Sequence, residues 1–138
     1  MYIGVIMKIN LTRKEHKNYL SVTPQDIDKY DIGEVEEIIL GDVPNYLPIN
    51  QAKEYVMKCM SKLRHGGKLY LNSVNVYELA RLTAMGVIST DDFNKDVFNG
   101  KQSCFSTDDI IGLSQNMNHQ LHSLNINGTN IEAELIRP

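Results

Sequence analysis

The sequence predicts an α/β fold, and three stretches of the chain carry this prediction. The β-branched run Ile3–Leu11 is typical of a buried strand. An amphipathic segment that starts at Asn50 leads through two glycines into Lys68–Leu71, which predicts a helix, a tight turn and a strand. After an Asn-Gly turn signal, apolar and polar residues alternate over Ile131–Leu135, which predicts a closing antiparallel hairpin.

Two further strands are expected in the first third of the chain. Tyr19–Val22 is a short strand closed by a Thr-Pro pair, and Val35–Leu40 is an apolar run bounded by a glycine. Between them, Asp26–Gly33 is polar enough to be a connecting loop. The segment Pro44–Pro48 excludes regular helix and central strand, because proline fixes φ and lacks an N–H group.

The clearest predicted helix is Asn50–Arg64, with Asn50 as its N-cap. Apolar residues recur there every three or four positions and form one stripe to be buried: Ala52, Tyr55, Val56, Cys59, Met60 and Leu63. Gly66 and Gly67 supply the backbone conformation that stops a helix, and a strand follows.

Three short helices are expected before the hairpin. The first is Val76–Met85, capped by Ser73 or Asn75, and the second is Thr90–Phe98, capped by its first residue. The third begins at residues 106–107, where two aspartates in the first turn suit the helix dipole.

The composition fits one globular domain over residues 1–138, with 42% hydrophobic and 22% charged residues. A net charge of −3 argues against a domain that tracks a nucleic-acid backbone by bulk charge. Cys59 and Cys104 stand alone, so we expect no metal site and a reducing, cytoplasmic location. The apolar start is too short to span a membrane and lacks the features of an export signal.

Polar side chains follow two of the predicted strands. The loop Gly41–Pro48 combines a carboxylate, an amide and a phenol, and Asn72–Tyr77 follows the next strand. Ligands of open α/β sheets bind at the carboxyl ends of strands, so both loops are at the expected edge. The alternative is that their polar residues only form turns and helix caps: Asp42, Asn45, Asn72 and Asn75.

Other candidate groups give weaker signals. The charged run Thr12–Lys17 contains no glycine; its side chains could hold an anion, or it is a solvated loop. Cys59 belongs to the apolar stripe and is expected in the core. The histidines are expected at the surface: His16, His65, His119 and His122.

Two motifs flank the predicted helix: Val-Pro-Asn-Tyr-Leu-Pro at 43–48 and Leu-Arg-His-Gly-Gly-Lys-Leu at 63–69. This arrangement resembles class I S-adenosylmethionine-dependent methyltransferases, in which a Leu-Glu-His-Leu-Pro loop precedes a helix that ends in Arg/Lys-x-Leu-Lys-Pro-Gly-Gly. The segments 103–109, 125–128 and 132–138 look like the last helix and the sixth and seventh strands of that family. The likeness covers Glu34–Pro138 and implies a reduced Rossmann-like methyltransferase fold.

The first third departs from the family pattern. The family has a glycine-rich cofactor loop after strand one and an acidic residue at the end of strand two, and this chain has neither. The intervals Leu11–Tyr19 and Thr23–Val35 are too short for the first crossover helix and for a helix plus a normal third strand. We therefore expect five or six strands, mostly parallel, with an antiparallel hairpin at one side.

The resemblance implies S-adenosylmethionine as the cofactor, bound at the carboxyl ends of the strands. The residues expected to contact it are Asn10, Thr12, Asp42, Asn45 and Tyr46. No catalytic residue, methyl acceptor or metal is predicted. The sequence thus predicts a methyltransferase-like protein with a degenerate cofactor site. Two alternatives stay open: a non-catalytic interaction or scaffold subunit on the same fold, and a small nucleotide-binding α/β protein.

The missing helix and strand also predict an assembly. One face of the sheet near Ile3–Leu11, or the edge at Tyr19–Val22, should be uncovered in a monomer. Exposed apolar patches usually mark an interface, so we expect a twofold homodimer through this region.

Overall fold

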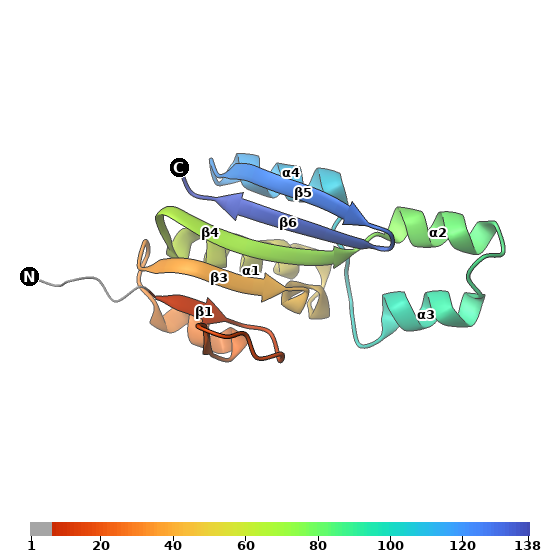
Figure 1. Ribbon diagram of the computed structural model, residues 1–138, viewed down its shortest axis with the longest axis horizontal. Helices are drawn as coiled ribbons and strands as arrows, with labels where there is room; N and C mark the ends of the chain where they lie inside the picture. The colour runs from red at the N-terminus through yellow and green to blue at the C-terminus, as the bar shows by residue number, and fades with distance from the viewer. Residues whose placement is uncertain (1–6) are drawn as a thin grey trace, which may run out of the picture.

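Six strands form a single sheet in the order β2-β1-β3-β4-β6-β5 (Figure 1). The computed structural model describes residues 7–138, so residues 3–6 of the predicted first strand lie outside the described residues. The strands have these bounds: β1 Lys8–Asn10, β2 Leu20–Ser21, β3 Val35–Gly41, β4 Leu63–Val74, β5 Gln120–Asn127 and β6 Asn130–Ile136.

The direction of the strands confirms the predicted α/β fold. β1 pairs in parallel with both β2 and β3, and β3 pairs in parallel with β4. β6 is antiparallel to β4 on one side and to β5 on the other, so the chain closes on an antiparallel hairpin. The sheet is therefore mostly parallel, with the antiparallel pairs confined to its C-terminal side.

The strand order reverses at β1. The chain passes from β1 to β2 on one side and then returns to place β3 on the other side. In open parallel sheets such a reversal leaves a crevice at the carboxyl ends of the two diverging strands. The loops that follow β1 and β3 are therefore the first place to look for a site.

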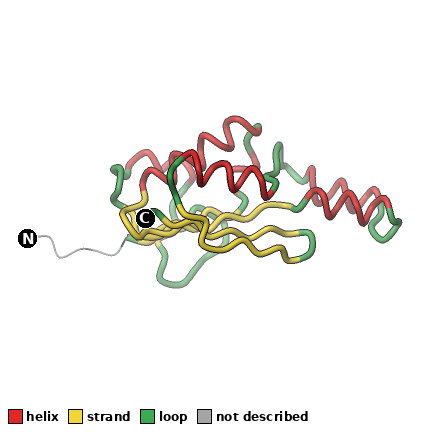
Figure 2. Tube along the Cα trace, turned by 90° about the horizontal axis from the view of Figure 1, so that it is seen from above, coloured by secondary structure: helices red, strands yellow, loops and turns green. Residues whose placement is uncertain are grey.

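Two helices cover one face of the sheet: α1 (Ile49–Lys62) and α4 (Thr107–Asn116), above the strands in Figure 2. The predicted stripe of α1 is largely confirmed, since Ala52, Val56, Cys59 and Met60 are fully buried. On the strands, alternate residues face these helices, as the period of two requires. The core contains the buried residues of the helices and those of the strands, and its strand residues include Ile9, Ile38, Leu40, Leu69, Leu71 and Leu135.

The opposite face of the sheet carries no helix of the described chain (Figure 2), and its central part is polar. Glu37 accepts a hydrogen bond from the Tyr19 hydroxyl at 2.9 Å and pairs with the Lys8 ammonium at 3.1 Å. Partial burial alone would raise the pKa of Glu37, but these two groups lower it below its usual value. Lys68 and Glu134 add a further ion pair at 3.5 Å. Because its charged and polar side chains are paired with one another, this face can be in contact with water. The homodimer expected from the sequence stays a prediction.

The boundary between α1 and β4 differs from the prediction. The helix ends at Lys62, and Leu63 is the first residue of β4, where it is fully buried. The N-cap is Pro48, so the assignment of that role to Asn50 is wrong. Gly66 and Gly67 lie within β4 rather than at a helix stop. Their backbone groups exchange hydrogen bonds with Arg137, in a bulge that interrupts the β3–β4 register.

A connecting loop is predicted for Asp26–Gly33, but the interval between β2 and β3 is more regular than that. It contains a 3-10 helix, η1, over Pro24–Lys29. Thr23 and Asp26 form a reciprocal capping box at its start, and its single apolar side chain, Ile27, is buried. A second 3-10 helix, η2 at Val43–Tyr46, follows β3.

The helices α2 (Val76–Ala84) and α3 (Thr90–Phe98) form an arm that extends beyond the end of the sheet (Figure 1). Asn75 caps α2 and Ser106 caps α4, and each is one of two alternatives predicted for its helix. The cap of α3 is Ser89, one residue before the predicted Thr90. Large exposed apolar side chains gather on the arm: Tyr77, Met85, Val87 and Phe98. No described helix has the length and apolar character needed to cross a bilayer.

Candidate functional site

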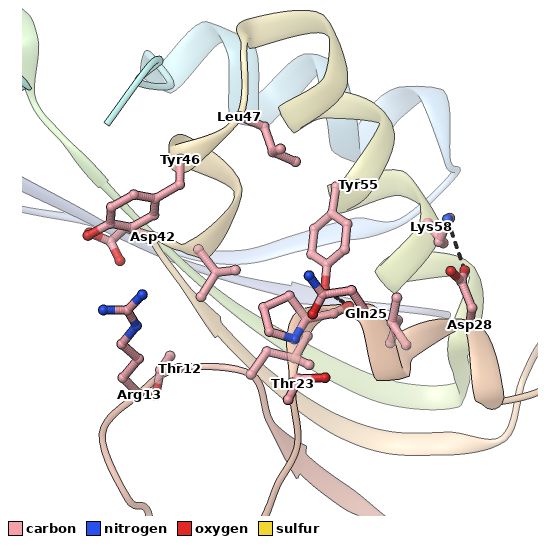
Figure 3. Close-up of a pocket in the computed structure, with 14 residues that line it drawn as sticks. Thr12, Arg13, Thr23, Gln25, Asp28, Asp42, Tyr46, Leu47, Tyr55 and Lys58 are labelled. Carbon is pink, nitrogen blue, oxygen red and sulfur yellow. Dashed lines mark hydrogen bonds and ion pairs between the residues drawn. The ribbon is translucent and has the colours of Figure 1, made fainter. Parts of the chain in front are cut away.

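A cavity of about 740 Å³ opens where β1, β2 and β3 end, at the point where the strand order reverses. Figure 3 shows side chains from three loops and from α1 around one space. The lining is formed by Leu11, Thr12, Arg13, Thr23, Pro24, Gln25, Ile27, Asp28, Asp42, Val43, Tyr46, Leu47, Tyr55 and Lys58.

The loop after β1 is held by the buried side chain of Asn10. Its Oδ1 accepts hydrogen bonds from the Thr12 backbone N–H at 3.0 Å and from the Thr12 hydroxyl at 2.6 Å. Its Nδ2 donates to the Lys14 carbonyl at 2.6 Å. Asn10 therefore shapes the loop from within, and Thr12 presents its remaining surface to the cavity.

The loops after β1 and β3 meet at Gly41. A Cβ atom at this position would lie 2.8 Å from Cγ2 of Thr12, and the φ angle of +57° also favours glycine. The glycine that ends β3 thus allows Thr12 to pack directly against the neighbouring strand. Thr12 lines the cavity, whereas Gly41 lines the hollow on the other face of the sheet.

The loop after β3 is tied to the segment that returns from the arm. Asp42 pairs with the Lys101 ammonium at 3.1 Å. The Asn45 carbonyl accepts hydrogen bonds from the backbone of Gln102 and Ser103, and the Gln102 side chain donates to the Tyr46 carbonyl at 3.0 Å. These contacts fix η2 while leaving the Tyr46 side chain 47% exposed at the cavity rim.

The wall beside α1 is held by two contacts that Figure 3 marks with dashed lines. The Tyr55 hydroxyl donates to the Pro24 carbonyl at 2.6 Å, and burial raises the pKa of this phenol. Lys58 pairs with Asp28 at 2.9 Å. Both contacts join α1 to η1, so the residues after β2 form a fixed side of the cavity.

The predicted cofactor-binding residues divide into two groups. Thr12, Asp42 and Tyr46 line the cavity. Asn10 and Asn45 are fully or almost fully buried and lie outside the lining, where they hold the two loops in place. Asn10 and Asn45 thus support the cavity without lining it, because their side-chain amides donate hydrogen bonds to Lys14 and Ser103.

Several lining residues were not among the predicted ones, in particular Arg13, Gln25 and Tyr55. Arg13 lies in a charged run whose capacity to hold an anion is visible in the sequence. Gln25 lies between the Thr-Pro pair and the predicted loop Asp26–Gly33, and Tyr55 belongs to the helix stripe that is expected in the core. Neither pattern shows that the two residues converge on the ends of β1 and β3.

The second predicted loop, Asn72–Tyr77, does not join this cavity. Asn75 caps α2, and Asn72 lines a separate hollow of about 560 Å³ on the uncovered sheet face, with His16 and Tyr70 among its neighbours. Within residues 7–138, no three His, Cys, Asp or Glu side chains are grouped so that they could hold a metal ion. Burial raises the pKa of the Cys59 thiol to about 12, in keeping with a core residue.

The sequence matches no protein-family model and no curated protein. Solved structures are similar, among them an O-methyltransferase family protein from Burkholderia thailandensis (15% identity, TM-score 0.58). A magnesium protoporphyrin IX methyltransferase from Synechocystis with bound SAH is similar at 16% identity and a TM-score of 0.57. A possible histamine N-methyltransferase from Thermotoga maritima is also similar, at 13% identity and a TM-score of 0.59. The chain has the Rossmann-like methyltransferase fold.

Each of these three alignments covers 87% of this chain. In return, the chain spans 35%, 51% and 64% of the length of the three proteins, in the same order. Identities this low establish the fold alone.

Proposed function

We propose that this chain is an S-adenosylmethionine-dependent methyltransferase-like domain that binds its cofactor in the cavity beyond β1, β2 and β3. The observation that carries the proposal is the place of the cavity at the reversal of strand order, where open α/β sheets bind their ligands. The similar Synechocystis methyltransferase, which carries bound SAH, supports this choice of ligand.

The residues of the cavity fit such a cofactor in size and chemistry. A volume of about 740 Å³ is in the range of small-molecule sites, which are mostly apolar with a few oriented polar groups. Leu11, Val43 and Leu47 supply an apolar wall, and the half-exposed ring of Tyr46 offers a surface on which a purine can stack. Thr12 and Asp42 add polar atoms at the strand ends.

Bound S-adenosylmethionine supplies a methyl group already activated on a sulfonium, so the protein chiefly has to bind and orient. Both carboxylates in the lining are ion-paired, Asp28 with Lys58 and Asp42 with Lys101. The Tyr55 hydroxyl donates to a backbone carbonyl and has a raised pKa. Among the lining residues that the structure describes, each carboxylate and the Tyr55 hydroxyl thus already has a partner, and the methyl acceptor would have to be nucleophilic by itself.

Isothermal calorimetry with S-adenosylmethionine, S-adenosylhomocysteine and a panel of nucleotides tests the proposal. Tyr46→Ala should weaken binding of S-adenosylhomocysteine about tenfold or more, because stacking on an aromatic ring is lost. Asp42→Asn should also weaken it. Tyr77→Ala and Asp91→Asn make the same changes on the arm and should leave the affinity unchanged. Binding of nucleotides alone would refute the proposal in favour of the nucleotide-binding alternative.

The scaffold alternative keeps one specific observation in its favour: the exposed apolar side chains of the arm, of which Tyr77 and Val87 are 72% and 67% exposed. If calorimetry detects no heat of binding with any adenosine compound, this alternative is favoured. The proposed homodimer is tested by sedimentation equilibrium at micromolar concentration, where a species of 15.7 kDa would refute it.

A further inference from the structure

The charged side chains that line the cavity are not all ion-paired within the described part of the chain. Two carboxylates line it, and each faces an ammonium group: Asp28 faces Lys58 at 2.9 Å, and Asp42 faces Lys101 at 3.1 Å. Arg13 also lines the cavity and forms no ion pair with any residue of the described part of the chain. The guanidinium is thus the one charge of the lining without a counter-charge within residues 7–138.

The Arg13 side chain is oriented toward the ligand space. In Figure 3 it extends from the loop after β1 toward the side of the cavity on which Asp42 and Tyr46 lie. Arg13 and Lys14 are both exposed, but only Arg13 lines the cavity. Of the basic residues in the charged loop, Arg13 is therefore the one that borders the cavity.

The backbone of the same loop is poorly suited to receive an anion. Nucleotide-binding loops do so by aiming several N–H groups at the charge, which usually requires glycines. Residues 12–18 contain no glycine, and the Thr12 N–H is already bonded to Asn10 at 3.0 Å. An anionic group at the end of β1 would have to be held by a side chain.

We infer that Arg13 binds the carboxylate of the amino-acid part of S-adenosylmethionine, in place of a glycine-rich backbone turn. The inference rests on the proposed function and names the residue that binds the polar end of the cofactor. A guanidinium can donate two parallel hydrogen bonds to a carboxylate, which gives both affinity and orientation. The adenosine end then lies along the apolar wall of the cavity.

A comparison of two ligands on matched variants tests this inference by calorimetry. S-adenosylhomocysteine carries the carboxylate, whereas 5′-methylthioadenosine shares its adenosine and thioether but lacks the amino-acid part. Arg13→Gln should weaken S-adenosylhomocysteine about tenfold or more and leave 5′-methylthioadenosine unchanged. Lys14→Gln removes a charge from the same loop outside the cavity and should change neither affinity. Raising the salt concentration from about 50 mM to about 0.5 M should weaken S-adenosylhomocysteine more in the wild type than in Arg13→Gln.

The outcomes separate this inference from the proposed function. If the wild type binds neither adenosine ligand, the proposed function fails. If it binds S-adenosylhomocysteine and Arg13→Gln binds it equally well, only the role of Arg13 is refuted. An equal loss for both ligands in Arg13→Gln would also refute that role, because the effect would not depend on the carboxylate. A urea midpoint like that of the wild type confirms that the variant is folded.

Discussion

Two neighbouring glycines in β4 should respond very differently to the same substitution. A Cβ atom at Gly67 would lie 2.8 Å from the Arg64 carbonyl oxygen and 3.0 Å from that of Glu36. At Gly66 it would meet no atom within 4 Å, although the φ angle there is +78°. We therefore expect Gly67→Ala to be the more damaging change.

The magnitudes follow from these two surroundings. For Gly66→Ala, a left-handed backbone costs about 1–2 kcal/mol, partly offset by about 0.4–1 kcal/mol from the less flexible unfolded chain. The net loss is then about 1 kcal/mol. For Gly67→Ala, both obstacles are backbone atoms of the β3–β4 region, which cannot move without disturbing the sheet. Overpacking of this kind costs about 1–3 kcal/mol, and we expect the upper end, about 3 kcal/mol.

Urea unfolding followed by circular dichroism measures both losses, and the chain has no tryptophan to follow by fluorescence. Gly86→Ala is the matched control, because Gly86 has a φ angle of +77° and open space around its Cβ position. It should lose about as much as Gly66→Ala. Equal midpoints for Gly66→Ala and Gly67→Ala, or the reverse order, would show that the bulge does not have this geometry.

Further changes have expected outcomes of the same kind. Leu63→Ala removes a fully buried side chain and should cost about 2–5 kcal/mol in urea unfolding, whereas Leu20→Ala, at 61% exposure, should cost far less. Similar costs would contradict the burial of Leu63. Glu37→Gln should be less stable than the wild type at pH 7, and the difference should shrink as the pH falls below about 4, because a carboxyl whose pKa is lowered by folding stabilises only while ionised. A difference that persists unchanged at low pH would contradict this. In native protein, a thiol reagent should modify the half-buried Cys104 before the buried Cys59, and the reverse order would place Cys59 outside the core.

The sequence allowed much of the fold to be predicted because local signals decided it. The spacing of apolar residues identified α1. Asn75 was one of two candidate caps because Glu78 follows three positions later, and the aspartates after Ser106 and Thr107 indicated the start of α4. The end of α1 was missed because Leu63 continues the helical spacing while already belonging to β4. A glycine pair that stops a helix and one that forms a bulge look alike until the partner strand is known.

The site was predictable only in part. Parallel strands end at one edge of the sheet, which is why Thr12, Asp42 and Tyr46 were expected together. No pattern shows that Asn10 turns its amide into its own loop, since that depends on the path of residues 12–14. Gln25 and Tyr55 reach the cavity from separate elements, and their convergence depends on the packing of η1 against α1.

The position of β6 has a consequence for synthesis. β6 is the last of the six strands to leave the ribosome, yet it lies between β4 and β5 and pairs with residues 68–74 of β4 and with β5. Until residues 130–136 emerge, β4 has no partner on one side and β5 has no neighbour in the sheet. A nascent chain therefore carries open strand edges on β4 and β5, the feature that makes unfinished β structure prone to aggregate. Completion of the sheet is an event that follows translation of its final strand.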